Sequence, residues 1–185
     1  MDGNGLLGYA LTAVQLASMR LTTVMNHSGT FVTTRSAEEV FDLLADPQRF
    51  AVLLPDFESM TLGDATHFTL RIAIAVGQIS GHANLAMELR EAARPNRVHY
   101  SGQGIVAGSQ LNFALQFAIA PTVQATEVNW QGEVSVDGML ALMAGGLIEP
   151  MGRRTFGLMA ERLQNGLGED AASSSNRPPD FEQLP

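Results

Sequence analysis

The chain contains no cysteine among its 185 residues. A disulfide framework, a thiolate nucleophile and a metal site with cysteine ligands are therefore excluded. Basic residues are also few, since 11 Lys and Arg stand against 19 Asp and Glu and give a formal net charge of -8. Binding to a phosphate backbone needs clustered cations, so this balance argues against nucleic acid as a partner. We expect a cytoplasmic protein, because a chain without cysteine is compatible with a reducing compartment.

The sequence also lacks the closely spaced motifs of metal sites and hydrolases. Its histidines, His27, His67, His82 and His99, form neither an HxH nor an HExxH pair. Ser109 lacks the GxSxG frame of a hydrolase nucleophile. We therefore expect no metal, no resident cofactor and no catalytic residue, with an enzyme as the rival hypothesis.

No uninterrupted run of about 20 apolar residues is present, as a membrane-spanning helix would require. The apolar stretch from Met1 to Val24 is broken by Thr12, Gln15 and Arg20 and has no positively charged start, so it does not resemble a signal peptide. Two interpretations of this extension stay open: a short docking or interfacial helix, or a poorly ordered segment. Residues 168–185 are rich in Ser, Pro and acids and are predicted to be a disordered acidic tail. One domain is expected between them, over residues 25–167.

Three segments alternate apolar and other residues: His67 to Val76, Leu111 to Ala120 and Ala125 to Val136. A period of two predicts strands with one apolar face. Shorter runs predict four more strands, at Met25 to Thr34, Phe57 to Leu62, Ala83 to Leu89 and Val98 to Gly104. No helical segment separates the later strands, which favours an antiparallel sheet.

Helix start signals occur after the first strand and after the last one. Ser36 to Glu39 has the pattern of a capping box, and Asp46 followed by Pro47 gives a second start. Apolar residues recur at helical spacing from Met139 to Leu167, and Pro150 is expected to kink or divide this helix. The sequence predicts an α+β fold in which a curved sheet of about seven antiparallel strands wraps around a long C-terminal helix, with two short helices after the first strand.

Several short motifs together carry a family resemblance. They are Gly29 with Phe31 and Val32, Ser36 to Val40, Leu44 to Pro47 leading to Leu54 and Pro55, Val76-Gly77, the glycines 102, 104 and 108, Thr126 to Trp130, and Val136 to Gly138 leading to Leu147 and Ile148. On these motifs the chain, from about Met25 to Leu167, resembles the CoxG family of carbon monoxide dehydrogenase subunits, within the helix-grip superfamily that includes START domains and polyketide cyclases. One position departs: where the family usually has Pro-Gly-Cys after the second helix, this chain has Pro55, Asp56 and Phe57.

The resemblance implies a non-catalytic accessory protein of a carbon monoxide dehydrogenase-type molybdenum hydroxylase. Roles suggested for the family are membrane attachment of that enzyme, help in its maturation, and carriage of a lipophilic quinone. The partners implied are a lipophilic small molecule, the hydroxylase subunits and the inner face of the membrane. A quinone carrier needs a long apolar tunnel with a few polar groups at one end.

The inward apolar rows of the predicted strands and helix supply the candidate wall of such a tunnel. The predicted ligand-binding residues are Ile72, Ile74, Met87, Phe113, Leu115, Trp130, Met143, Leu147 and Met151. Methionine adapts to irregular ligands, which suits a deformable wall. We expect only apolar groups there. Two alternatives stay open: a cyclase or hydrolase-like enzyme using the same cavity, and an assembly factor whose core is filled by its own side chains.

Overall fold

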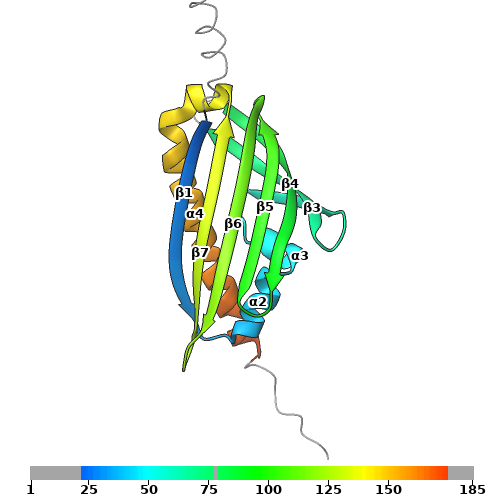
Figure 1. Cartoon of the computed structure of the whole chain (residues 1–185), viewed down its shortest axis with the longest axis vertical. Helices are drawn as coiled ribbons and strands as arrows, with labels where there is room; N and C mark the ends of the chain where they lie inside the picture. The colour runs from blue at the N-terminus through cyan, green and yellow to red at the C-terminus, as the bar shows by residue number, and fades with distance from the viewer. Residues whose placement is uncertain (1–21, 77–78, 175–185) are drawn as a thin grey trace, which may run out of the picture.

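The computed structural model describes residues 22–76 and 79–174, apart from the side chains of residues 76, 79, 143–145, 147–148 and 168–174. This part of the chain forms one seven-stranded antiparallel sheet in the order β1-β7-β6-β5-β4-β3-β2, with three helices (Figure 1). The strands are β1 (Thr22–Thr33), β2 (Phe57–Leu62), β3 (His67–Val76), β4 (Ile79–Ala93), β5 (Arg97–Val106), β6 (Ser109–Pro121) and β7 (Thr126–Asp137), and the helices are α2 (Ala37–Leu44), α3 (Pro47–Ala51) and α4 (Met139–Ser174). The predicted α+β class and the number of strands are confirmed.

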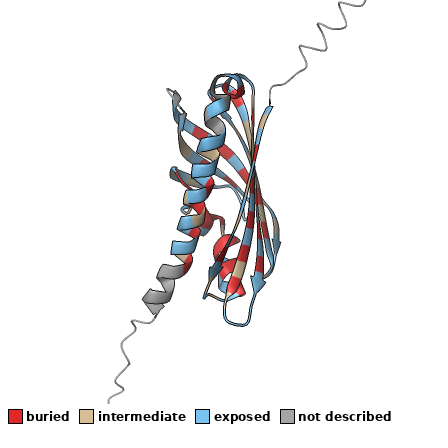
Figure 2. Cartoon of the chain, turned by 90° about the vertical axis from the view of Figure 1, so that its left-hand side faces the viewer, coloured by how far each residue is buried: buried red, intermediate tan, exposed pale blue. Residues whose placement is uncertain are grey.

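The sheet buries one face against α4, as the alternating segments predicted. Leu115, Phe117 and Ile119 of β6 are buried, whereas Gln116 and Ala118 between them are exposed. The long strands pair in register, from Leu111 opposite Val136 to Pro121 opposite Thr126 between β6 and β7. Figure 2 shows the buried residues between the sheet and α4 and around the short helices.

The two short helices close one end of the sheet. The capping box is formed, since the Ser36 hydroxyl accepts from the Glu39 amide at 3.3 Å and the Glu39 carboxylate accepts from the Ser36 amide at 2.9 Å. Phe50 of α3 stacks on Tyr100 of β5 with ring centroids 4.4 Å apart. The Tyr100 hydroxyl donates to the Leu44 carbonyl at 2.7 Å, and burial raises the pKa of this phenol. Aromatic side chains therefore fill the core at this end of the sheet.

The long helix α4 begins directly after β7, through a turn at Gly138 with φ of 91°. Its Leu140 amide donates to the hydroxyl of Ser109 at 2.8 Å, so the buried Ser109 acts as a helix cap. Pro150 lies inside the helix, which bends: the yellow first turns cross one end of the molecule and the later part runs along the sheet (Figure 1). The helix therefore continues through Pro150 and is not divided there.

The ends of the domain lie further out than predicted. β1 begins at Thr22, three residues before Met25, and α4 continues to Ser174, so helical backbone includes the first residues of the segment predicted to be disordered. Buried side chains at Met159, Leu163 and Leu167 hold α4 against the core near that segment. Residues 1–21 and 175–185, on which the other predictions for the two extensions fall, lie outside the described residues.

Candidate functional site

The position of α4 across the sheet is set by two glycines. A side chain on Gly152 of α4 would come within 2.9 Å of the Met25 sulfur on β1, and one on Gly132 of β7 would collide with the Phe156 ring. The absence of both side chains lets α4 approach β1 and β7 closely, and α4 contacts β1 more than any other strand. The helix therefore leans toward one side of the sheet and leaves space on the side of β3 and β4.

That space is a cavity of about 290 Å³ between the sheet and α4. Its wall is formed by Met25, Leu54, Pro55, Asp56, Leu70, Ile72, Ala73, Ile74, Ala75, Leu85, Met87, Leu111, Phe113, Val134, Met151, Gly152, Arg154, Thr155, Phe156, Leu158 and Met159. Since a cavity of roughly 150 Å³ with an apolar lining accommodates benzene, this volume can accommodate a two-ring head group or an alkyl chain of similar size. The wall is predominantly apolar.

Five of the nine predicted ligand-binding residues line the cavity: Ile72, Ile74, Met87, Phe113 and Met151. Two do not: Leu115 is buried in the core outside the wall, and Trp130 lies behind the wall residue Phe156, on which it stacks with 5.6 Å between ring centroids. The side chains of Met143 and Leu147 lie outside the described residues.

Phe156 separates the cavity from the residues behind it. Its ring also lies 6.5 Å from Phe113 and 5.1 Å from His27, centroid to centroid, so aromatic rings surround it on the sheet side. Trp130, one of these rings, would meet a ligand only if Phe156 moved. Trp130 points inward, as predicted, but a core ring of α4 covers it.

Three polar residues belong to the wall, contrary to the expectation of apolar groups alone. Asp56, Arg154 and Thr155 are all exposed, so they lie where the cavity opens to solvent. Asp56 has a left-handed backbone with φ of 58°, and its carbonyl accepts from the Ala73 amide at 2.9 Å, which fixes the turn against β3. The substitution of Asp for the usual glycine in the Pro-Gly-Cys motif was the sequence signal for Asp56. No sequence pattern indicated Arg154 or Thr155, because their position in the cavity wall depends on the rotation of α4 about its axis.

Two of the histidines form surface pairs with carboxylates. His82 lies 2.8 Å from the Glu58 carboxylate and His67 lies 3.0 Å from that of Asp64, and all four side chains are at least about one-third exposed. Within residues 22–76 and 79–174, no group of three His, Asp or Glu side chains is placed to bind a metal ion. In the same part of the chain, no helix is long and apolar enough to cross a membrane. The cavity is therefore the candidate site.

Solved structures show the same fold. A conserved protein from Geobacillus kaustophilus matches with a TM-score of 0.68 at 15% identity, covering 78% of this chain and 96% of that one. The Zhui aromatase/cyclase from Streptomyces sp. R1128 matches with a TM-score of 0.59 at 13% identity over 80% and 96% of the two chains. A START superfamily protein from Mycobacterium smegmatis matches with a TM-score of 0.54 at 13% identity over 78% and 97%. These likenesses confirm the helix-grip fold.

The sequence comparisons identify the family. No curated protein sequence matches the chain. The model of the CoxG family, whose members are described as a subunit of carbon monoxide dehydrogenase, matches residues 29–169, which span the sheet, the short helices and most of α4. The chain belongs to the CoxG family of carbon monoxide dehydrogenase subunits.

Proposed function

We propose that the protein carries a lipophilic ligand, a quinone, in the cavity between the sheet and α4. The observation that carries this proposal is an apolar wall around about 290 Å³ with its polar residues only at the opening. A quinone with an isoprenoid tail combines a large apolar area with a small polar head, which matches this division. A two-ring head buries roughly 200 Å², about the area of a large aromatic side chain, and so contributes about 5 kcal/mol.

Family membership supports carbon monoxide dehydrogenase as the partner of this carrier. The family is named as a subunit of carbon monoxide dehydrogenase, so the protein serves as a non-catalytic accessory of a molybdenum hydroxylase of that type. Such an enzyme releases electrons, and a quinone in the cavity would accept them and return to the membrane. The proposal thus places the protein in the cytoplasm, between the hydroxylase and the inner face of the membrane.

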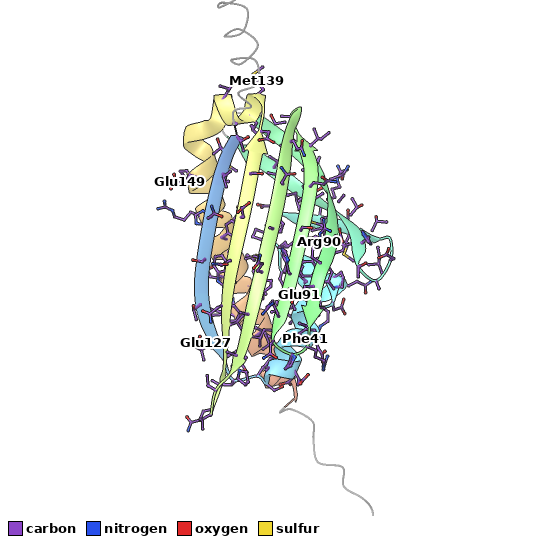
Figure 3. The ribbon with its side chains drawn as sticks, in the orientation of Figure 1. Phe41, Arg90, Glu91, Glu127, Met139 and Glu149 are labelled. Carbon is purple, nitrogen blue, oxygen red and sulfur yellow. The ribbon has the colours of Figure 1, made fainter. Side chains whose placement is uncertain are left out.

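One end of the molecule is suited to a peripheral contact with lipid. Ile105 of β5 is 71% exposed, and Met139 and Leu142 of α4 are 61% and 59% exposed. The Ser109 cap joins the β5–β6 turn to α4, and Figure 3 shows Met139 at this end, with Glu127 and Phe41 toward the other. Residues 103–112 and 138–148 contain no charged side chain. Because the chain as a whole carries a charge of -8, two segments without charged side chains offer an apolar surface that anionic lipid does not repel directly.

Native mass spectrometry of protein purified from its own host, followed by organic extraction, tests the carrier function. We expect a quinone of defined mass at one molecule per chain. Protein that contains no extractable lipophile and takes up no added 2-methyl-1,4-naphthoquinone would contradict the proposal.

A cyclase-like enzyme is the second candidate function. One solved structure of the same fold is an aromatase/cyclase, and Asp56 at the opening of the cavity is a carboxylate available for acid–base chemistry. The two functions differ in what they return: a carrier releases its ligand unchanged, whereas an enzyme releases a compound of altered structure. Chromatography of the extracted ligand before and after incubation with fresh protein separates them.

A further inference from the structure

The opening of the cavity holds the carboxylate of Asp56 and the guanidinium of Arg154. Among the described residues, neither the Asp56 carboxylate nor the Arg154 guanidinium forms a hydrogen bond or an ion pair. The neighbouring Arg153 differs, since it pairs with Glu149 at 3.0 Å. Thr155 adds a hydroxyl to the same rim. A ligand whose rings fill the apolar cavity would place its oxygen atoms at this rim.

The three groups differ in whether they donate or accept hydrogen bonds. A guanidinium only donates hydrogen bonds, a hydroxyl both donates and accepts, and a carboxylate only accepts. An oxidised quinone head presents carbonyl oxygens, which are acceptors that Arg154 and Thr155 can satisfy but the Asp56 carboxylate cannot. A reduced head presents hydroxyl groups, which can donate to Asp56 and still accept from Arg154.

We infer that Asp56 makes this site selective for ligands whose head carries a hydroxyl donor, such as a hydroquinone or another phenol, over ligands whose head only accepts. This inference rests on the proposed carrier function and names the form of the ligand that the site holds more tightly. A hydroxyl bonded to a carboxylate forms a charge-assisted hydrogen bond, whereas a carbonyl facing the same carboxylate leaves two acceptors in contact. The protein would therefore retain the reduced ligand longer than the oxidised one.

The backbone at Asp56 allows a matched set of variants. Asp and Asn both tolerate the left-handed conformation, so Asp56→Asn removes the charge while preserving size and turn geometry. Asp56→Gly suits the same conformation and removes the side chain altogether. Glu133→Gln, on the exposed face of β7, changes the net charge by the same amount away from the cavity and serves as the control.

Binding of 1-naphthol and 1-methoxynaphthalene tests the inference, because the two ligands share a ring system and differ in the hydroxyl donor. Dissociation constants are measured by calorimetry for the wild-type protein and the three variants. We expect the ratio that favours 1-naphthol to fall about tenfold in Asp56→Asn and in Asp56→Gly, as for one charge-assisted hydrogen bond. Glu133→Gln should keep the wild-type ratio. An anaerobic comparison of 2-methyl-1,4-naphthoquinone with its hydroquinone should show the same change.

Three results of these measurements would contradict the inference. An equal ratio in wild-type protein and Asp56→Asn would overturn the inference and leave the carrier function standing. An equal fall in Glu133→Gln would also overturn it, since net charge alone would then be the cause. Failure of the wild-type protein to bind 1-naphthol, 1-methoxynaphthalene and 2-methyl-1,4-naphthoquinone would overturn the carrier function and the inference with it.

Discussion

Filling the cavity with a larger side chain should weaken ligand binding strongly while the fold survives. Met151 on α4 lines the cavity and is half-buried, so a tryptophan there can occupy the space without displacing the core behind it. A bound two-ring head contributes about 5 kcal/mol from roughly 200 Å² of buried area. The indole in Met151→Trp is about as large as that head, but methionine already fills part of the volume. We therefore expect a loss of about half, roughly 2.5 kcal/mol, which weakens binding about 70-fold.

The assay is a fluorescence titration with 2-methyl-1,4-naphthoquinone, with the midpoint of thermal unfolding measured on the same samples. Leu62→Trp is the matched control, because Leu62 on the edge strand β2 is 46% exposed and does not line the cavity. The control should bind as the wild-type protein does. A folded Met151→Trp variant with an unchanged dissociation constant would show that the ligand binds elsewhere.

Three other substitutions test separate parts of the structure. Tyr100→Phe leaves the buried Leu44 carbonyl without its donor, so unfolding should cost about 2 kcal/mol less and the Tm measured by calorimetry should fall by roughly 4–8 °C. Ala107 has φ of 48° before a glycine in the β5–β6 turn, and Ala107→Asn should raise the free energy of unfolding in urea by about 1 kcal/mol, because Asn tolerates this conformation better. Ile105→Glu should lower the fraction of protein that sediments with anionic vesicles, whereas Val123→Glu, at a fully exposed position near the other end, should leave it unchanged. An unchanged Tm, an unchanged stability in urea, or equal sedimentation of the two glutamate variants would contradict the respective reasoning.

The sheet could be predicted from the sequence because its signal is local. Alternation with a period of two marks a half-buried strand wherever the strand later pairs, and β3, β6 and β7 carried that pattern over ten or more residues. The caps at Ser36 and Asp46 are local in the same sense, since each places an acceptor next to its own helix start. These features need no knowledge of distant contacts.

The cavity wall could be predicted only in part because it depends on contacts between distant segments. Periodicity places Trp130 on the inward face, which is right, but it does not tell which inward residues α4 covers. That outcome depends on Gly152 meeting β1 and on Phe156 lying over Gly132, contacts between residues more than 20 positions apart in sequence. Arg154 was missed for the same reason, since the rotation of α4 brings it to the rim.

A ligand in the cavity should stabilise the folded protein, because it binds the native state and not the unfolded chain. At a concentration 100 times its dissociation constant, 2-methyl-1,4-naphthoquinone should stabilise the protein by about 2.7 kcal/mol and raise the Tm by roughly 5–10 °C. The shift should be largely lost in Met151→Trp and kept in Leu62→Trp, and an equal shift in both variants would mean that the stabilisation does not arise in the cavity.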